Sequence, residues 1–445
     1  MSNLEENTNE EEKIQESFNK SHINLVFIGH VDAGKSTIAG HIMVLSGKIE
    51  KRVLEKFEKE AKQKNRESWK YAFVMDLTDY EREKGKTEEV GKAYFETENR
   101  RFTILDAPGH GSFVPNMIGG AAQADVGILI ISSRKGEFET GFNKGGQTRE
   151  HAMLSKIMGI EDLIVVVNKI DDKTVNYSEK RYLKIKQKIR PFLKRLGYDV
   201  ENRVKFCAIS GFTGEGIKIP LDQKKCPWYT GKTLLEELDN LNPPKDLSGE
   251  STRMTIIDKY RASGVIAYGK VVSGKLTMNE SYLLMPLNRK VTITGMTNQD
   301  YPVEEVRSNE NAKVKLKGVE DDEFKVGYVL SSIKNPVPVG KRFLAQVNLI
   351  QHESIICPGY QAVMHLHSAT IECTLSKFLA VVNVKKQSVI EKNPKFMKQH
   401  QTVVVKISVP VPICLDIYKN NKQLGIFTLR TMGKTIAIGR VTHIF

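Results

Sequence analysis

Eight residues near the start of the chain have the types and the spacing of a phosphate-binding loop. They are Gly29-His30-Val31-Asp32-Ala33-Gly34-Lys35-Ser36, followed by Thr37, and they match the pattern G-x-x-x-x-G-K-[ST]. Glycines let the backbone approach a phosphate chain and aim several N–H groups at it. Lys35 is expected to reach the β- and γ-phosphates, and the Ser36 hydroxyl to bind Mg²⁺. An ordinary glycine-rich turn is the alternative.

The elements on either side of this loop favour the phosphate-binding interpretation. Residues 23–28 (INLVFI) form a short apolar run that predicts a buried strand, and residues 36–45 have the pattern of a helix. The N-terminus of a helix carries a partial positive charge, which attracts a phosphate at the same point. The sequence therefore predicts the strand–loop–helix unit in which such loops work.

A second strand is expected to bring a carboxylate and a histidine to the same place. Residues 101–105 (RFTIL) lead directly into Asp106-Ala107-Pro108-Gly109-His110. Asp106 would hold the magnesium shell from the other side, and the Gly109 N–H would contact a γ-phosphate. His110 would orient an attacking water, and a loop histidine without a role is the alternative. In the polar segment before this strand, Thr87 is a candidate hydroxyl that reaches Mg²⁺ only when a γ-phosphate is present.

Polar residues also follow two later strands, and they point to guanine. The apolar run of residues 162–167 ends in Asn168-Lys169-Ile170-Asp171. A carboxylate such as that of Asp171 accepts hydrogen bonds from guanine N1–H and its exocyclic amine, which adenine lacks. Asn168 would bind the base or brace the phosphate loop, and Lys169 would cover the ring. The strand at 204–209 leads to Ser210-Gly211, whose backbone is a candidate contact for guanine O6.

Composition bounds the compartment and the partners. The chain has 445 residues, a net charge of +14 and five cysteines without C-x-x-C spacing, so we expect free thiols and a cytoplasmic protein. No apolar run approaches the ~18 residues of a membrane span, and the first residues are acidic rather than those of a signal peptide. A basic surface favours polyanions or acidic proteins, although it is also compatible with a solvated face.

The order of the predicted elements divides the chain into four parts. Residues 1–20 are an acidic tail that we expect to be disordered, and residues 21–243 alternate strands and helices. Short β-rich runs fill residues 250–335 and 336–445, after proline-rich boundaries. The fold class is therefore an α/β P-loop GTPase domain with a mostly parallel sheet, followed by two all-β barrel domains. The last part has 14 Lys and Arg against 4 Asp and Glu, which makes it the basic end of the chain.

Two further patterns are interpreted as structural. His365 and His367 lie two residues apart on a predicted strand, but no third ligand accompanies them, so the sequence does not favour a metal site. Gly145-Gly146-Gln147 spells a tripeptide by which class-1 release factors promote peptide release. It lies inside the nucleotide-binding part, before a helix expected at residues 148–158, and we interpret it as a turn.

The combination of these motifs with two β-barrels resembles the translational GTPases of the elongation-factor-1-alpha type over residues 22–445. Within them the local sequence is similar to the eukaryotic release factor 3 family, in Gly85-Lys86-Thr87, Ser112 to Ala121, Cys226-Pro227-Trp228-Tyr229, Ile356 to Tyr360, and Gly433 to Gly439. Gly111 stands where that family usually has lysine, so the resemblance implies a switch whose behaviour differs quantitatively.

The resemblance implies a GTPase that binds GTP, GDP and Mg²⁺ and drives translation termination. Its partners would be the ribosome, with its RNA, and a class-1 release factor that docks on the two barrels, mainly the basic C-terminal one. The free protein would be a monomer, without contact to membranes. A ribosome-rescue GTPase, a carrier of aminoacyl-tRNA and a GTP-binding scaffold that no longer hydrolyses are the alternatives.

Overall fold

The computed structural model describes residues 18, 20–64, 69–75, 90–110, 113–143, 145–262, 264–350, 352, 354–383 and 388–445. Thr87, Gly111 and most of the acidic tail lie outside these residues. The main division of the chain falls between Pro244 and Lys245, which separates two compact units. No described helix combines the length and the apolar composition that crossing a membrane requires.

The first unit contains one six-stranded sheet in the order β2-β3-β1-β4-β5-β6. All neighbours in it are parallel except β2 and β3, so the sheet is mostly parallel, as predicted. The strands are β1 (Ser21–Gly29), β2 (Gly91–Glu96), β3 (Arg100–Asp106), β4 (Val126–Ser132), β5 (Asp162–Asn168) and β6 (Val204–Ala208). The apolar run predicted at residues 162–167 is β5, and β4 is a similar apolar run. Both are buried almost throughout because helices cover both faces of the sheet.

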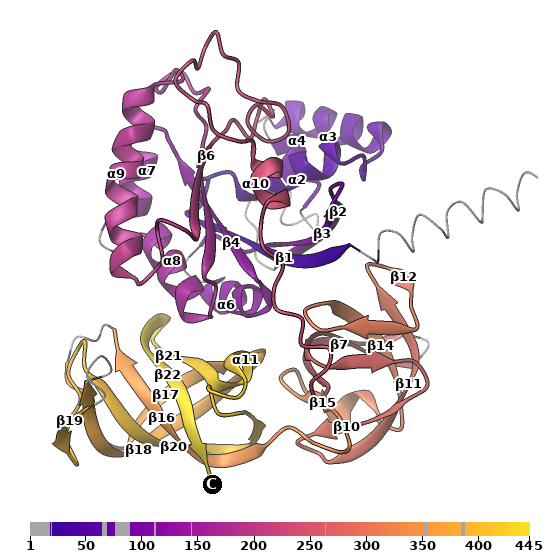
Figure 1. Ribbon diagram of the computed structural model, residues 1–445, viewed down its shortest axis with the longest axis vertical. Helices are drawn as coiled ribbons and strands as arrows, with labels where there is room; N and C mark the ends of the chain where they lie inside the picture. The colour runs from indigo at the N-terminus through magenta and orange to yellow at the C-terminus, as the bar shows by residue number, and fades with distance from the viewer. Residues whose placement is uncertain are drawn as a thin grey trace, which may run out of the picture. The chain divides into compact units, whose positions relative to one another are not determined.

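Helices lie on the two faces of this sheet (Figure 1). They are α2 (Lys35–Leu45), α3 (Lys51–Gln63), α4 (Trp69–Ala72), α6 (Val114–Gln123), α7 (Glu137–Phe142), α8 (Gln147–Ile157), α9 (Glu179–Arg195) and α10 (Leu234–Asp239). Alternate residues of β1 form a core with α2 and α10 through Ile23, Leu25, Phe27, Ile38, Ile42, Leu234 and Leu238. This packing fixes the end of β1 against the start of α2, and therefore fixes the loop that joins them.

The second unit begins with a sheet in the order β10-β15-β7-β8-β14-β11-β12. Its strands and those of a small companion sheet are β7 (Arg253–Ala262), β8 (Gly264–Ser273), β9 (Lys275–Thr277), β10 (Ser281–Met285), β11 (Arg289–Asn298), β12 (Tyr301–Pro302), β13 (Glu305–Arg307), β14 (Asn311–Lys317) and β15 (Val329–Ser331), with a 3₁₀ turn at Asp321–Glu323. Because β10 also pairs with β11, the sheet closes on itself as a barrel.

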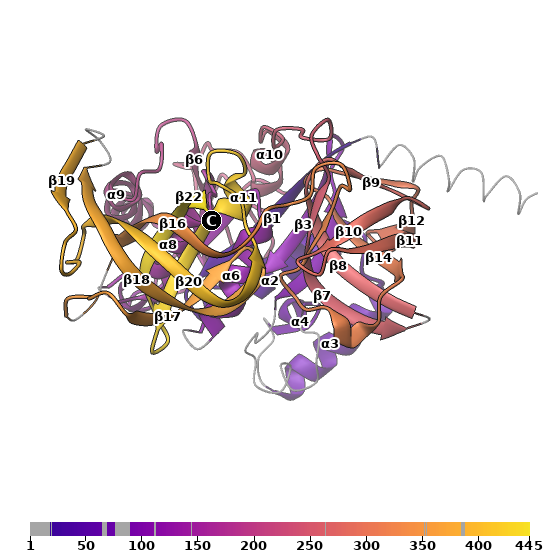
Figure 2. The same cartoon turned by 90° about the horizontal axis from the view of Figure 1, so that it is seen from below.

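A second barrel follows in the same unit, with the order β17-β21-β22-β16-β20-β18-β19 and closure by β17 on β18. Its elements are β16 (Val339–Leu349), β17 (Tyr360–Leu366), β18 (Ala369–Asn383), β19 (Ser388–Lys392), β20 (Thr402–Cys414), α11 (Lys422–Gly425), β21 (Ile426–Thr431) and β22 (Lys434–Ile444). Figure 2 shows the long strands β18 and β20 side by side in its wall. The predicted class of two all-β barrels after an α/β domain is confirmed.

Cysteines and histidines of the barrels have structural surroundings. All five cysteines of the chain are free thiols, as predicted. Nε2 of His367 lies 3.1 Å from the Cys414 carbonyl oxygen, to which it donates. The described residues contain no group of three or more His, Cys, Asp or Glu side chains that could hold a metal ion.

His365 of β17 and His367, which directly follows that strand, make the stability of the fold sensitive to acid. Burial lowers the pKa of His365 and of His367 to about 4, and the positive charge of Arg430 adds to the effect at His365. The unfolded chain, with a histidine pKa of about 6.5, therefore binds more protons between pH 6.5 and 4. We expect the free energy of unfolding to be complete above pH 6.5 and to fall as the pH drops toward 4, by up to about 3 kcal/mol per histidine. Urea unfolding at several pH values should show that the free energy of unfolding depends less steeply on pH in the H365Q/H367Q double variant than in the wild type. An equal pH dependence in the two proteins would contradict the role of these histidines.

Candidate functional site

The predicted phosphate loop connects β1 to α2 in a conformation that only glycine permits at two points. Gly34 caps α2 in the left-handed region, with φ of 96°, and a Cβ added there would lie 2.4 Å from Nδ2 of Asn168. Gly29 has φ of 144°, and its Cβ would lie 2.2 Å from the carbonyl oxygen of Ile130. A side chain at Gly34 would collide with the Asn168 amide and one at Gly29 with the backbone of β4, so this loop conformation, which a phosphate-binding role requires, depends on both glycines.

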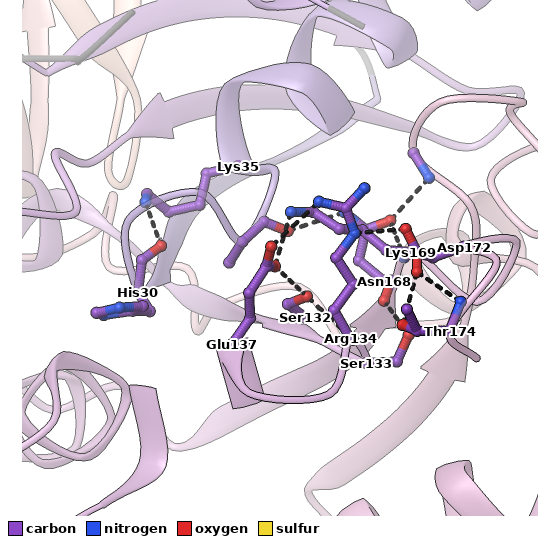
Figure 3. Close-up of polar contacts among 12 residues, drawn as sticks. His30, Lys35, Ser132, Ser133, Arg134, Glu137, Asn168, Lys169, Asp172 and Thr174 are labelled. Atoms are coloured by element: carbon purple, nitrogen blue, oxygen red, sulfur yellow. Dashed lines mark hydrogen bonds and ion pairs between the residues drawn. The ribbon is translucent and has the colours of Figure 1, made fainter. Parts of the chain in front are cut away.

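Lys35 is held inside this loop. Its Nζ donates to the carbonyl oxygen of His30 at 3.0 Å (Figure 3) and to that of Gly29 at 3.4 Å. Burial lowers the pKa of Lys35, and the negative charges of Asp106 and Asp32 oppose that shift. The ammonium group is thus taken out of water and aimed at the loop, where phosphate oxygens would supply stronger partners than two carbonyls.

The segment after β3 lies against the same loop. Asp106 is the last residue of β3, is fully buried and pairs in register with Phe27 of β1. A Cβ on Gly109 would lie 2.4 Å from the Lys35 Nζ and 3.0 Å from the Val31 nitrogen. The structure therefore brings Asp106 and Gly109 to the phosphate loop. His110 follows with an exposed side chain, and Thr87 lies outside the described residues.

Asn168 joins the phosphate loop to the two loops predicted to bind a base. Its Nδ2 donates to the Ala33 carbonyl at 2.9 Å, and its Oδ1 accepts from the backbone N–H of Lys169 at 2.7 Å. The same Oδ1 accepts from the Gly211 N–H at 2.8 Å. Of the two roles weighed for Asn168, the structure has it brace the phosphate loop. The contact from Ser210 and Gly211 to guanine O6 stays a prediction.

Lys169 is oriented by acidic residues that the sequence did not single out. Its Nζ lies 2.9 Å from Oε2 of Glu137, and that carboxylate also accepts from the Ser132 hydroxyl at 2.6 Å. Burial alone would raise the pKa of Glu137, but hydrogen bonds from Ser132 and Lys169 lower it overall. Arg134 bridges Glu137 to Asp172, at 3.1 and 2.5 Å (Figure 3). This cluster fixes the aliphatic stem of Lys169 where it can cover a base.

The carboxylate of Asp171 is a candidate hydrogen-bond acceptor for a base. Its side chain is half-buried in the loop after β5. In the part of the chain that the structure describes, no protein group donates a hydrogen bond to its carboxylate. A base with two adjacent N–H donors would therefore find two carboxylate oxygens available.

Two side chains of α8 reach the start of the phosphate loop. Nδ1 of His151 accepts from the Gly29 N–H at 3.1 Å, and Oε1 of Gln147 accepts from the Val31 N–H at 3.4 Å. His151 is fully buried, and burial lowers its pKa to about 3, so the ring is neutral and Nδ1 can accept. The Gly-Gly-Gln tripeptide thus belongs to the turn into α8, as interpreted, but its Gln147 also touches the site.

The oxygen donors present suit a hard cation held jointly with a phosphate chain. Ser36 lies in the first turn of α2 and Asp106 is the last residue of β3, so the strand–loop–helix geometry places both oxygen donors. Mg²⁺ accepts few protein ligands and keeps phosphate and water oxygens for the rest. The Ser36 hydroxyl and the Asp106 carboxylate fit that pattern, because they would supply two oxygen donors from the protein.

Comparison with known proteins gives three family matches along the chain. The model of the Elongation factor Tu GTP binding domain matches residues 20–244. That of Elongation factor Tu domain 2 matches residues 264–331, and that of the GTP-eEF1A C-terminal domain-like family matches residues 342–442.

Individual relatives are similar over almost the whole chain. The eukaryotic peptide chain release factor GTP-binding subunit of Kluyveromyces lactis is 44% identical over 98% of this chain and 62% of its own length. The protein with the same description from Schizosaccharomyces pombe is 42% identical, over 99% of this chain and 66% of its own. This chain therefore spans just under two thirds of the length of these relatives.

A solved structure shares the fold. The S. cerevisiae Ski7 GTPase-like domain, bound to GDP and inorganic phosphate, matches with a TM-score of 0.77. The match covers 95% of this chain and 97% of that one, at 17% sequence identity.

Proposed function

Because this chain belongs to the eukaryotic release factor 3 family of translational GTPases, we propose that it binds and hydrolyses GTP to drive translation termination. It would act in the cytoplasm as the GTP-binding partner of a class-1 release factor on the ribosome. GTP and GDP are the nucleotides, and Mg²⁺ is the metal. The domain assignments are 21–243 for the GTPase part and 250–335 and 336–445 for the barrels.

The observation that carries this proposal is the hydrogen bonding of one side chain. The Asn168 amide joins the phosphate loop at Ala33 to the backbone of Lys169 and of Gly211. A loop for phosphates and a loop for a base are thereby held at a fixed separation, which is the requirement for recognising a nucleotide as a whole. Asp171 supplies the guanine preference because its carboxylate would lose two hydrogen bonds with adenine.

Phosphoryl transfer needs positioning and charge neutralisation more than covalent chemistry. Lys35 would neutralise the β- and γ-phosphates, and the Gly109 N–H would contact the γ-phosphate. Ser36, Thr87 and Asp106 would hold Mg²⁺, which supplies further neutralisation of the phosphate oxygens. No arginine finger is identifiable, so we expect slow hydrolysis by the protein alone.

The barrels would carry the partner. Within the second unit they share a buried cluster of Met285, Val329, Val337, Cys414 and Leu424. Arg253 of β7 is also ion-paired with the buried Asp416 that follows β20. These contacts support a pair of barrels that moves as one body, and the basic end of the chain supports the C-terminal barrel as the main docking surface for the class-1 factor.

A reconstituted peptide-release assay tests this function. Ribosomes stalled at a stop codon and a class-1 release factor should release peptide faster when this protein and GTP are added. No acceleration by the protein, with a class-1 factor that is active by itself, would overturn the termination proposal. Binding to the stalled-ribosome paralogue of the class-1 factor, or to aminoacyl-tRNA, in a pull-down would instead identify a rescue factor or a carrier.

Substitution of His110 separates hydrolysis from binding. The H110A variant should lose about 10²–10⁴-fold of the stimulated GTPase rate, which is the usual contribution of a positioned proton-transfer or water-orienting group. GTP binding should be unchanged, since the exposed side chain contributes little to packing. H110Q, which can still hydrogen-bond a water, should retain more activity than H110A. Full turnover by H110A would show that His110 has no catalytic role.

A further inference from the structure

His41 lies between the loop proposed to contact guanine and helix α4, and it contacts both. It belongs to α2, the helix that starts at the phosphate loop, and only 5% of it is exposed. Its Nδ1 lies 2.9 Å from the Gly211 carbonyl oxygen. Because a carbonyl oxygen can only accept, Nδ1 carries the proton and donates to Gly211. The ring also stacks on Tyr71 of α4, with centroids 3.9 Å apart and planes inclined by 9°.

Both contacts of His41 are enforced by close backbone packing. On the Gly211 side, Gly214 has φ of 85°, and a Cβ added there would lie 2.8 Å from Cε1 of His41. On the α4 side, a Cβ on Gly40 would lie 1.8 Å from the Tyr71 carbonyl oxygen. Two glycines thus allow the loop and α4 to pack closely against the imidazole from different directions. Both contacts are therefore made by a buried ring with little freedom to move.

The backbone of Gly211 is held at both its N–H and its carbonyl by this arrangement. Its N–H donates to Asn168 and its carbonyl accepts from His41. The backbone conformation at Gly211 would decide where the loop meets a bound base. His41 therefore supports a residue of the proposed base site, Gly211, just as Asn168 supports a residue of the phosphate loop, Ala33.

We infer that His41 is a positioning residue that orients the Gly211 loop for the guanine base and couples the occupancy of the base site to the order of helix α4. The inference rests on the proposed guanine-nucleotide site. Its two contacts have different consequences. The hydrogen bond to Gly211 sets nucleotide affinity, and the stack on Tyr71 transmits the ordering of the loop to α4.

Two substitutions at the same position separate these consequences. H41F keeps a ring that can stack on Tyr71 but removes the donor to Gly211. H41N keeps a donor near the position of Nδ1 but removes the ring. Y71F retains the stack and serves as the matched control, and Y71L removes the stack from the other side.

The experiment measures nucleotide dissociation with fluorescent GDP and GTP, and hydrogen exchange of the α4 region with and without GDP. Wild-type α4 should be more protected with GDP, at the Phe73 amide that donates to the Trp69 carbonyl, for example. H41F should release both nucleotides about tenfold faster, the effect of one lost hydrogen bond. H41N and Y71L should keep dissociation rates within about threefold of wild type but lose the GDP-dependent protection of α4.

Each alternative outcome is decisive. Wild-type dissociation rates in H41F would overturn the positioning role. GDP-dependent protection of α4 that survives in H41N and Y71L, or that is absent from the wild type while GDP binds, would overturn the coupling. A wild-type protein that binds neither GDP nor GTP would instead refute the proposed function. Thermal unfolding of each variant separates these effects from a general loss of stability, and Y71F should behave as wild type in every measurement.

Discussion

Replacing Asp171 with asparagine is expected to weaken GTP binding by about a thousandfold and to create binding of xanthosine triphosphate. Guanine presents N1–H and an exocyclic amine, and two hydrogen bonds to a charged acceptor contribute about 1.5–3 kcal/mol each. An asparagine offers one acceptor and one donor, so the guanine amine meets an N–H. Xanthine carries a carbonyl in place of that amine, which matches the asparagine. Competition binding with GTP and xanthosine triphosphate measures whether the variant now prefers the xanthine nucleotide.

The neighbouring carboxylate supplies the control for this substitution. Asp172 is engaged by Arg134 at 2.5 Å and by Thr174. D172N should therefore disturb the local loop without changing which base is preferred. If D171N bound GTP as wild type does, or if D172N showed the same change of preference, Asp171 would not be the base-selecting residue.

The Lys35-to-methionine variant is expected to lose GTP affinity by about two to three orders of magnitude while it remains folded. Removing one partner of a buried charge pair costs about 3–5 kcal/mol, and a bound phosphate chain would be left without its ammonium partner. In the protein without nucleotide the same change removes a desolvated charge, whose pKa burial has already lowered. Thermal stability without nucleotide should therefore be equal or higher, and calorimetric GTP titration should show the loss of affinity.

An exposed lysine just beyond the same helix distinguishes a local effect from net charge. Lys48 follows the C-terminal end of α2 and is exposed. K48M removes the same charge but should bind GTP with wild-type affinity. Equal losses in the K35M and K48M variants would attribute the effect to overall charge and would contradict the role of Lys35 in the phosphate loop.

Much of the site could be predicted from the sequence because its residues directly follow strands. Gly34 and Lys35 stand at a strand–helix junction, and Asp106 and Asn168 are the last residues of β3 and β5. Parallel strands bring their carboxyl ends to one edge of a sheet. Short apolar runs were therefore sufficient to predict that these side chains gather.

The interactions that hold these residues were not predictable in the same way. Asn168 bonds to Ala33, 135 residues earlier, and to Gly211, 43 residues later. Lys169 meets Glu137 across a gap of 32 residues. Such hydrogen bonds depend on the conformation of several loops at once and leave no spacing pattern. The Gly-Gly-Gln segment was noticed, but nothing in its residue types connected Gln147 to Val31, and no pattern in the sequence connected Glu137 to Lys169.

The barrels were predictable as a class but not in their pairing. Alternating apolar residues and glycine turns indicate β-strands, whereas the choice of neighbours depends on tertiary packing. β10, for example, pairs with both β11 and β15, and the second of these pairings joins strands separated by four intervening ones. The second barrel likewise depends on a long-range pairing, that of β17 with β21, which no local pattern contains.

Steady-state GTP turnover tests the central claim most directly. It should be measured for the protein alone, with ribosomes, with a class-1 release factor, and with both. A partner-activated GTPase should turn over slowly alone and much faster only when ribosomes and the release factor are present together. Equal turnover in all four conditions, with GTP bound, would contradict this account.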